Sequence, residues 1–181
     1  DEGHARVATY TQAGHVIANH SHAHLNVRTV GAEVFSADLR QAHGLLKDLP
    51  GFQPWFRYPF LNQGNTLEDQ LAVKKTLAEL NYSHGYVTVD NYDFYLDTLL
   101  QRALEKKKKV DMEVLKQVYI ETLWRCIQFY DNLAKTTLQR SPKHMLLLHE
   151  NDLAALFIGD LVAFLREQGW RIISPSEAFS D

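Results

Sequence analysis

The chain has 181 residues, of which 45% are hydrophobic and 23% charged, and this composition suits an ordinary globular domain with a real core. Nineteen basic residues against 22 acidic ones leave a net charge of -3, which argues against a nucleic-acid partner. The single cysteine, Cys126, excludes an internal disulfide and a thiolate metal cluster. No apolar run reaches the roughly 18 residues that a transmembrane helix needs.

The first half of the chain alternates apolar runs with amphipathic segments. The expected elements, in chain order, are a helix over 4–13, a strand over 15–18, a helix over 32–49, a strand over 55–58 and a helix over 66–80. The helices follow from apolar residues at helical spacing. Gly14 and Pro50 are stop signals after the first two helices, and a capping box of Thr66 and Asp69 opens the third.

The second half continues the alternation. The expected elements are a strand over 84–89, helices over 93–108 and 111–139, a strand over 144–149, a helix over 152–168 and a strand over 170–174, before a terminal turn at Pro175. The basic run 106–109 lies among helix formers and indicates a solvated helix end rather than a phosphate or membrane patch. Cys126 falls on the apolar stripe of its helix and reads as a buried, inert thiol.

The order of elements predicts the fold class. Strands that are separated by helices are too far apart for hairpins, so we expect right-handed βαβ units and a parallel sheet, either open or closed into a barrel. No linker divides the chain, which predicts one domain over 1–181. Function in parallel barrels gathers at the carboxyl ends of the strands. Polar residues of this sequence fall at those ends: His20, His24, Arg57, Asp90, Asp93 and His149.

Nine histidines are a mild excess, and His20 and His24 are the most informative pair. Four residues apart on one helical turn, their imidazoles would point the same way and hold one metal ion. The same spacing also arises by chance in a histidine-rich stretch. His22 lies between them and is expected to point away.

His149 and Arg57 each have two interpretations. His149 is either a hydrogen-bonded structural residue or a general acid or base, and in the second case Asp93 would fix its tautomer. Arg57 is either a surface ion-pair residue or the clamp of a carboxylate in a site.

Four segments occur in the order of a known family: 14–24 (GHVIANHSHAH), 57–60 (RYPF), 90–94 (DNYDF) and 147–149 (LLH). They resemble four of the five motifs of the polysaccharide deacetylases, also called the NodB-homology domain or carbohydrate esterase family 4. The ending 169–174 is similar as well, so the resemblance spans nearly all the chain except about 95–142. It implies an α/β fold: an incomplete, distorted (β/α) barrel whose first strands are absent from this chain, with 95–142 as a helical insertion.

The resemblance implies a metal-dependent hydrolase that removes N- or O-acetyl groups from a polysaccharide or oligosaccharide. His20 and His24 would bind one divalent metal ion, which we expect to be zinc. The implied catalytic residues are a general acid that its neighbour orients, an arginine that tethers the base, and an amide that binds the oxyanion: His149, Asp93, Arg57 and Phe60. The implied walls of the acetyl site are Leu147, Phe94 and Tyr58.

The chain also departs from the family. The first motif, threonine-phenylalanine-aspartate-aspartate, supplies the catalytic base and the third metal ligand, and it has no counterpart here. We therefore expect the 181 residues alone to be inactive and to be a fragment of a longer protein, or to take the missing strands from elsewhere. Phe94 stands where tryptophan is usual, and Tyr58 where proline is frequent, which changes pocket shape more than chemistry.

Three alternatives stay open. The chain is a carbohydrate-binding relative with an impaired site, a phosphate-ester metallohydrolase, or a stable proteolytic core. The phosphate reading is weaker, because Arg57 is its one basic candidate. The family favours a periplasmic or secreted location. The polymer and the oligomeric state are left open.

Overall fold

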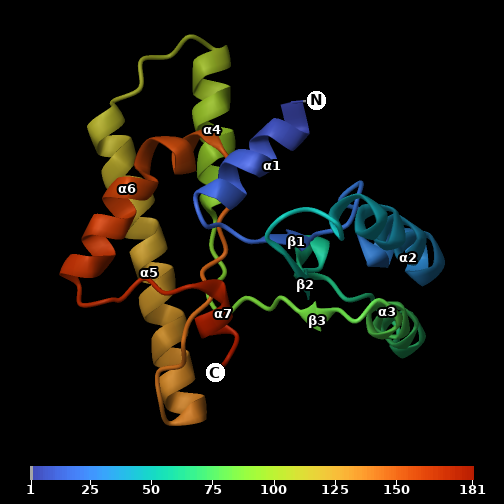
Figure 1. The fold of residues 1–181 in the computed structure, drawn as a ribbon. Coiled ribbons are helices and arrows are strands. Elements are labelled where there is room, and N and C mark those ends of the chain that lie inside the picture. The colour runs from blue at the N-terminus through green and yellow to red at the C-terminus, as the bar shows by residue number, and fades with distance from the viewer. Residues whose placement is uncertain (1) are drawn as a thin grey trace. The chain divides into compact units, whose positions relative to one another are not determined.

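The computed structural model describes residues 2–181, and their contacts divide into two compact units that meet between Tyr86 and Val87. The first unit holds a small sheet and three helices (Figure 1). Its elements are α1 (Glu2–Gln12), β1 (Ile17–Asn19), α2 (Val27–Leu46), β2 (Phe52–Phe56), the 3-10 turn η1 (Pro59–Leu61), α3 (Leu67–Glu79) and β3 (Ser83–His84). The three strands are parallel, in the order β1-β2-β3.

Thr66 caps α3 as predicted, but the Asp69 carboxylate bonds to the Thr66 hydroxyl and to a neighbouring helix instead of the Thr66 amide of a capping box. Thr66 accepts a hydrogen bond from the Asp69 amide at 3.1 Å and donates its hydroxyl to Asp69 Oδ2 at 2.8 Å. The other carboxylate oxygen of Asp69 accepts from the Ala32 amide at 3.1 Å. Gly31, with φ 76°, breaks α2 immediately before that amide. The continuous part of α2 therefore begins at Ala32, as the sequence predicts, and Asp69 caps it from the neighbouring helix.

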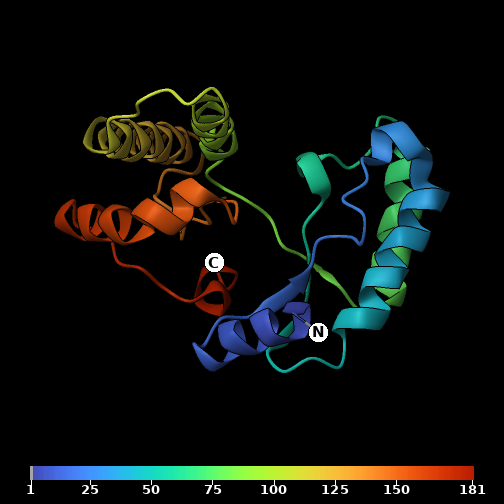
Figure 2. The same cartoon turned by 90° about the horizontal axis from the view of Figure 1, so that it is seen from above.

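The core of the first unit is aromatic and lies where α2 and α3, which run side by side in Figure 2, meet the sheet. Phe35 and Phe56 are fully buried and pack edge to face, with ring centroids 6.1 Å apart. Burying a side chain of this size contributes about 1.5–3 kcal/mol. The packing fixes the carboxyl ends of β1 and β2 next to each other, because Asn19 pairs with Phe56 in the sheet.

The second unit is helical. Its elements are α4 (Asp93–Glu105), α5 (Met112–Leu138), α6 (Asp152–Glu167) and the short α7 (Pro175–Ala178). The first three helices pack on one another around a core that includes Tyr119, Leu123 and Leu161, all less than 2% exposed. Cys126 is half-buried on α5, and burial, with a smaller effect of the Asp90 carboxylate, raises the pKa of its thiol, which favours the unreactive protonated form.

Three of the predicted strands are wrong in extent or absent. The strand expected over 84–89 is reduced to Ser83–His84, and 144–149 and 170–174 form no strand. Segment 144–149 meets only one extended neighbour: Val89 bridges Leu146, and the Leu147 amide donates to Val89 O at 3.0 Å. Segment 84–89 pairs with β2 only at its start, where His84 lies beside Phe56, and elsewhere in the described residues the segments have no strand neighbour beyond that bridge. The result is a mixed α/β structure, mostly helical, with a small open parallel sheet.

The predicted helical insertion can be placed in one of the two units. The predicted insertion 95–142 takes most of α4 and all of α5, and it lies wholly within the second unit. A single catalytic domain over 1–181, interrupted by this insertion, stays a prediction.

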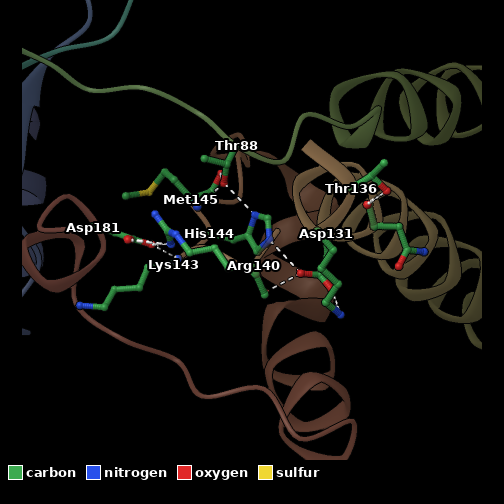
Figure 3. A network of polar contacts seen from close by, with 11 residues as sticks. Thr88, Asp131, Thr136, Arg140, Lys143, His144, Met145 and Asp181 are labelled. Atoms are coloured by element: carbon green, nitrogen blue, oxygen red, sulfur yellow. Dashed lines mark hydrogen bonds and ion pairs between the residues drawn. The ribbon is translucent and has the colours of Figure 1, made fainter. Parts of the chain in front are cut away.

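A buried polar network joins the end of α5 to segment 141–145 in the second unit (Figure 3). Asp131, 7% exposed, accepts hydrogen bonds from Ser141 Oγ at 2.5 Å and Lys135 Nζ at 2.6 Å. The His144 ring connects Asp131 Oδ1, at 3.3 Å, to Thr88 Oγ1, at 3.1 Å. Burial by itself would raise the pKa of Asp131, but the hydrogen bonds from Lys135, Ser141 and His144 outweigh it and lower that pKa.

Candidate functional site

His20 and His24 lie together in a loop and not on a helix. The prediction of one helical turn is wrong, because residues 20–26 are irregular and α2 begins at Val27. Their rings nevertheless meet edge to face, with centroids 4.9 Å apart. Ser21 and His24 have left-handed backbones, with φ of 69° and 52°, and these two turns bring the imidazoles together. Left-handed conformations are uncommon outside glycine and are enriched at functional sites.

Two buried side chains hold this loop in place. Asn19 Oδ1 accepts from the Ser21 amide at 2.8 Å, and the Asp38 carboxylate accepts from the amides of His22 and Ala23 at 2.9 and 3.0 Å. Asp38 belongs to α2 and is 8% exposed. Sequence reasoning missed it, although a carboxylate on the apolar face of a helix, one residue before the buried Leu39, is a usable signal.

The His20 ring has a defined tautomer. Its Nδ1 lies 2.8 Å from the carbonyl oxygen of Arg57. A carbonyl can only accept, so Nδ1 carries the proton and the lone pair of the neutral imidazole is on Nε2. Histidine ligands of metals are commonly oriented in this way. The His22 ring lies against α2 instead, with Nε2 at 3.2 Å from Gln41.

Arg57 and Tyr58, which follow β2, are more enclosed than expected of surface residues. The Arg57 amide donates to Asn19 O at 3.1 Å and its Nε donates to Gly85 O at 3.0 Å. Burial lowers the pKa of its guanidinium, and among the described residues no carboxylate pairs with it. Tyr58 is 3% exposed, stacks on Phe35, and has a pKa that burial raises to about 12. Its surroundings are those of a core residue, and its part in substrate binding stays a prediction.

Phe60 occupies a strained turn beside His24. Its backbone is left-handed, with φ 57°, and so is that of Leu61, with φ 51°. Its ring is 62% exposed and lies edge to face on the His24 ring at 4.7 Å. The amides of Leu61 and Asn62 are both used inside the turn, donating to Tyr58 O and Pro59 O, whereas the Phe60 amide is not used in it.

His149 and Asp93 form the polar pair of the second unit. Asp93 is fully buried at the start of α4, and its two oxygens accept from His149 Nδ1 at 2.7 Å and from the His149 amide at 2.8 Å. The carboxylate therefore fixes both the backbone and the ring of His149. Because the proton is on Nδ1, the lone pair is on Nε2, and 43% of the His149 side chain is exposed. Such a histidine can exchange a proton with a bound molecule.

Phe94 and Leu147 flank this pair, and Asn91 supports it. The Phe94 ring is 49% exposed and meets the His149 ring edge to face at 5.6 Å. Asn91, which sequence reasoning missed, is 4% exposed; its Nδ2 donates to Leu147 O and its Oδ1 accepts from the Asp93 amide at 2.9 Å. The half-buried Leu147 is thus tied to the start of α4.

The implied metal ion fits part of this arrangement. Two imidazoles with a fixed geometry supply two ligands of a zinc site, which usually takes at least three from the protein. Among the side chains that the structure describes, no cluster of three or more histidine, cysteine, aspartate or glutamate residues has the geometry of a metal site. The described residues therefore offer the implied metal ion two of its ligands and not a complete coordination site.

One more residue of the first unit is close to the predicted ones. His84, at the end of β3, packs edge to face on Tyr58 with centroids 5.7 Å apart. Burial, with smaller effects of the Arg57 and Lys74 charges, lowers its pKa. In the sequence His84 opens the apolar run 84–89, whereas His149 closes one, so the search at the carboxyl ends of strands did not find it.

A separate property of the described helices is that none is both long and apolar enough to cross a bilayer.

A comparison with known protein families gives one match, and it falls within the first unit. Residues 1–82 match the family model described as polysaccharide deacetylase. The match includes His20, His24, Arg57, Tyr58 and Phe60, and it ends before Asp93 and His149. Neither the curated proteins nor the solved structures gave a match. The family match supports the resemblance to the polysaccharide deacetylases that the sequence motifs indicate, over residues 1–82 and so over less than half of the chain.

Proposed function

We propose that the protein is a metal-dependent hydrolase that removes N- or O-acetyl groups from an acetylated polysaccharide or oligosaccharide. The family implies deacetylation of a carbohydrate. The observation that carries the finer proposal is the His149–Asp93 pair, because a fully buried carboxylate fixes the tautomer of a half-exposed imidazole. This pair lies outside the matched residues and supports the same chemistry independently. A distorted (β/α) barrel as the complete fold, and a periplasmic or secreted location, belong to this proposal.

His20 and His24 would hold the divalent metal ion, which we propose to be zinc. The bound ion would activate water and polarise the acetyl carbonyl. His20 suits the role because its Nδ1 is occupied by the Arg57 carbonyl, which directs Nε2 to the ligand position. The amides of residues 21–23 are bonded to Asn19 and Asp38, so the loop keeps its shape without a ligand.

The remaining residues would act on charges and protons. The exposed Nε2 of His149 would give a proton to the departing sugar amine or hydroxyl, and Asp93 would stabilise the charged imidazole. The Phe60 amide would donate to the oxyanion. Arg57, whose Nε is already bonded to Gly85 O, would use its other guanidinium nitrogens to hold the carboxylate base. Phe94 and Leu147 would enclose the acetyl methyl, and burying one methyl group favours acetyl by about 1 kcal/mol.

A carbohydrate-binding relative with an impaired site is the second candidate. It is favoured by the donor set, since the described side chains provide two clustered imidazoles and no group of three or more metal ligands. Zinc analysis and a chromogenic acetyl ester separate the two candidates. The 181 residues alone are expected to bind carbohydrate with little or no turnover, and full turnover by them would mean that the base is misassigned.

The test of the proposal replaces Asp93 by Asn in the full natural chain. The substitution keeps the size of the side chain but removes the charge that stabilises the protonated His149 ring, so turnover should fall by about 10²- to 10⁴-fold. Acetate release from N-acetylglucosamine oligomers and acetylated xylan measures turnover, and metal analysis measures zinc. Zinc content should not change, because the Asp93 carboxylate is bonded to His149 and is not one of the proposed zinc ligands.

Asp97→Asn is the matched control. Asp97 lies one turn further along α4 and accepts from the Leu153 amide at 3.2 Å, without touching His149. It should lose some stability and keep its turnover. Equal loss of turnover in both variants, or loss of zinc in step with activity in Asp93→Asn, would refute the assigned role of Asp93.

A further inference from the structure

A pocket of about 310 Å³ opens between α5 and the segment that precedes α4, entirely within the second unit. Asp90 and Tyr92 line it on one side. On the other side lie residues of α5, the helix that the deacetylase motifs do not include: Arg125, Cys126, Phe129 and Tyr130. The proposed function uses none of these four residues, so the pocket requires its own explanation.

The walls of the pocket are aromatic and exposed. Phe129 is 62% exposed and Tyr92 is 64% exposed, which is unusual for large rings on a monomeric surface. Tyr130 is half-buried and packs edge to face on Phe129, with centroids 5.2 Å apart. Exposed rings around a concave site are typical of binding surfaces for ligands that have one apolar face and one polar edge. A pyranose ring has this character, because its C–H groups gather on one face and its hydroxyls on the rim.

The polar groups of the pocket fit a neutral ligand. Asp90 supplies a carboxylate, which accepts from the Asn91 amide at 2.8 Å and has further acceptor capacity for hydroxyls. Arg125 supplies donors, and its charge is paired with Glu121 one turn earlier. One carboxylate beside a paired guanidinium gives no net positive field, so a phosphate or another anion would not be favoured.

A line of aromatic contacts leads from the pocket to His149. Tyr92, at the pocket, has its ring centroid 6.3 Å from that of Phe94, and Phe94 lies 5.6 Å from the His149 ring. A chain of sugars that is processed at His149 would therefore meet aromatic side chains in the direction of the pocket. Because two ring-to-ring steps lie between the pocket and His149, the pocket would take a neighbouring sugar and not the reacting one.

We propose that this pocket is a subsite for a second sugar of the substrate, with Phe129 as its stacking platform. The inference rests on the proposed function, and it makes the substrate class a neutral acetylated oligosaccharide of at least two sugars. Tetramers should bind more tightly than the monosaccharide, and the difference should depend on α5.

The first test measures binding to the 181-residue protein, which needs no turnover. The probes are the monomer and the tetramer of N-acetylglucosamine and an acetylated xylotetraose, followed by titration calorimetry and amide chemical shifts. Phe129→Ala should weaken binding of the preferred tetramer about fivefold to tenfold and leave the monomer unaffected. Phe129→Tyr should restore tetramer binding. Leu133→Ala, 50% exposed on the same helix but outside the pocket, is the control.

Several results would overturn the subsite. Equal tetramer binding by wild type and Phe129→Ala, or no binding of either tetramer by the wild type, would do so. A change of oligomeric state in Phe129→Ala without a change in sugar binding would assign the exposed ring to a protein contact instead. Circular dichroism of each variant checks the fold, which truncation of an exposed ring should not disturb.

Acetate release by the full natural chain separates this inference from the proposed function. If Phe129→Ala raises KM for the tetramer and leaves kcat unchanged, both are supported. If the variant deacetylates the tetramer with the wild-type KM, the subsite fails and the hydrolase stands. If the wild type binds tetramer through Phe129 and releases no acetate, the subsite stands and the hydrolase fails.

Discussion

Asp131 lends itself to a sharp stability experiment, because three donors converge on one buried carboxylate. Ser141 Oγ, Lys135 Nζ and His144 Nε2 lie 2.5, 2.6 and 3.3 Å from its oxygens. Asp131→Asn keeps the volume but leaves one accepting oxygen and adds an NH₂ group. With the amide oxygen at the Oδ1 position, Ser141 and His144 keep their acceptor, and the NH₂ group faces the Lys135 ammonium, which loses its partner.

The expected loss follows from the three contacts. The Ser141 hydrogen bond to a charged acceptor contributes about 1.5–3 kcal/mol, and the longer His144 bond about 0.5–1.5 kcal/mol. The Lys135 pair adds only about 0.3–0.5 kcal/mol, because 56% of the lysine side chain is exposed. Asn keeps the Ser141 and His144 bonds, but the Ser141 bond to a neutral acceptor contributes only about 0.5–1.5 kcal/mol and the Lys135 pair is lost. We therefore expect Asp131→Asn to lose about 1–2 kcal/mol. For a chain of this length, such a loss lowers Tm by about 2–8 °C.

Urea and thermal unfolding, followed by circular dichroism, measure the difference at pH 7 and across the acid range. The pKa of Asp131 is lowered from its ordinary value of 3.8, so its stabilisation is present above that value and is lost as the pH falls through the lowered pKa. The wild type and the variant should therefore converge in acid. Asp160→Asn, whose carboxylate is 47% exposed and 4.0 Å from Lys116, is the control with a loss below about 0.5 kcal/mol. An equally small loss in Asp131→Asn, or a difference that persists in acid, would refute this reasoning.

The first unit carries three further predictions. Asp38→Asn should weaken the proposed zinc binding by about 10- to 100-fold, because one of the two loop amides that bond to Asp38 loses its acceptor. A competitive zinc titration measures the affinity, with the exposed Asp48→Asn as the control, and an unchanged affinity in Asp38→Asn would contradict the prediction. His84→Gln should make the free energy of unfolding less dependent on pH in the acid range. Because the pKa of His84 is lowered in the folded protein, its stabilising contribution is complete above the ordinary value of 6.5 and is lost as the pH falls from there. If the difference in urea midpoint between wild type and variant is the same at pH 5 and pH 7.5, the prediction is wrong. Gly85→Ala should destabilise by about 1–3 kcal/mol, since its Cβ would lie 3.2 Å from Phe56 O; an unchanged Tm would show that this backbone yields.

The helices were predictable and most strands were not, for different physical reasons. Helical signals are local: Thr66 and Asp69 are three residues apart, and Thr66 caps the helix that the pair predicts. A strand depends on a neighbour far along the chain. The apolar segment 144–149 has the composition of a strand, yet its strand pairing is limited to one isolated bridge, between its Leu146 and Val89. The composition of a segment shows its preference for the extended conformation, but whether it forms a strand depends on a partner segment with which it can pair.

The candidate site shows the same division. The pairing of His149 with Asp93 was predicted from residue types at the ends of expected strands, and the two side chains are in contact. The pairing of His20 with His24 was predicted from helical spacing, and it arises instead from left-handed turns at Ser21 and His24. The supports were missed, because Asp38 and Asn91 act through backbone groups that no spacing rule identifies.

The anchoring of the His20–His24 loop has a thermodynamic consequence. Three successive amides, at residues 21–23, are tied to Asn19 and Asp38, so the conformational entropy of this segment is lost when the protein folds and not when a cation arrives. Binding of the proposed metal ion would then require little backbone rearrangement, and its rate should follow the supply of free ion. The same three amides, although they belong to a solvent-facing loop, should exchange their hydrogens with water as slowly as amides inside a helix.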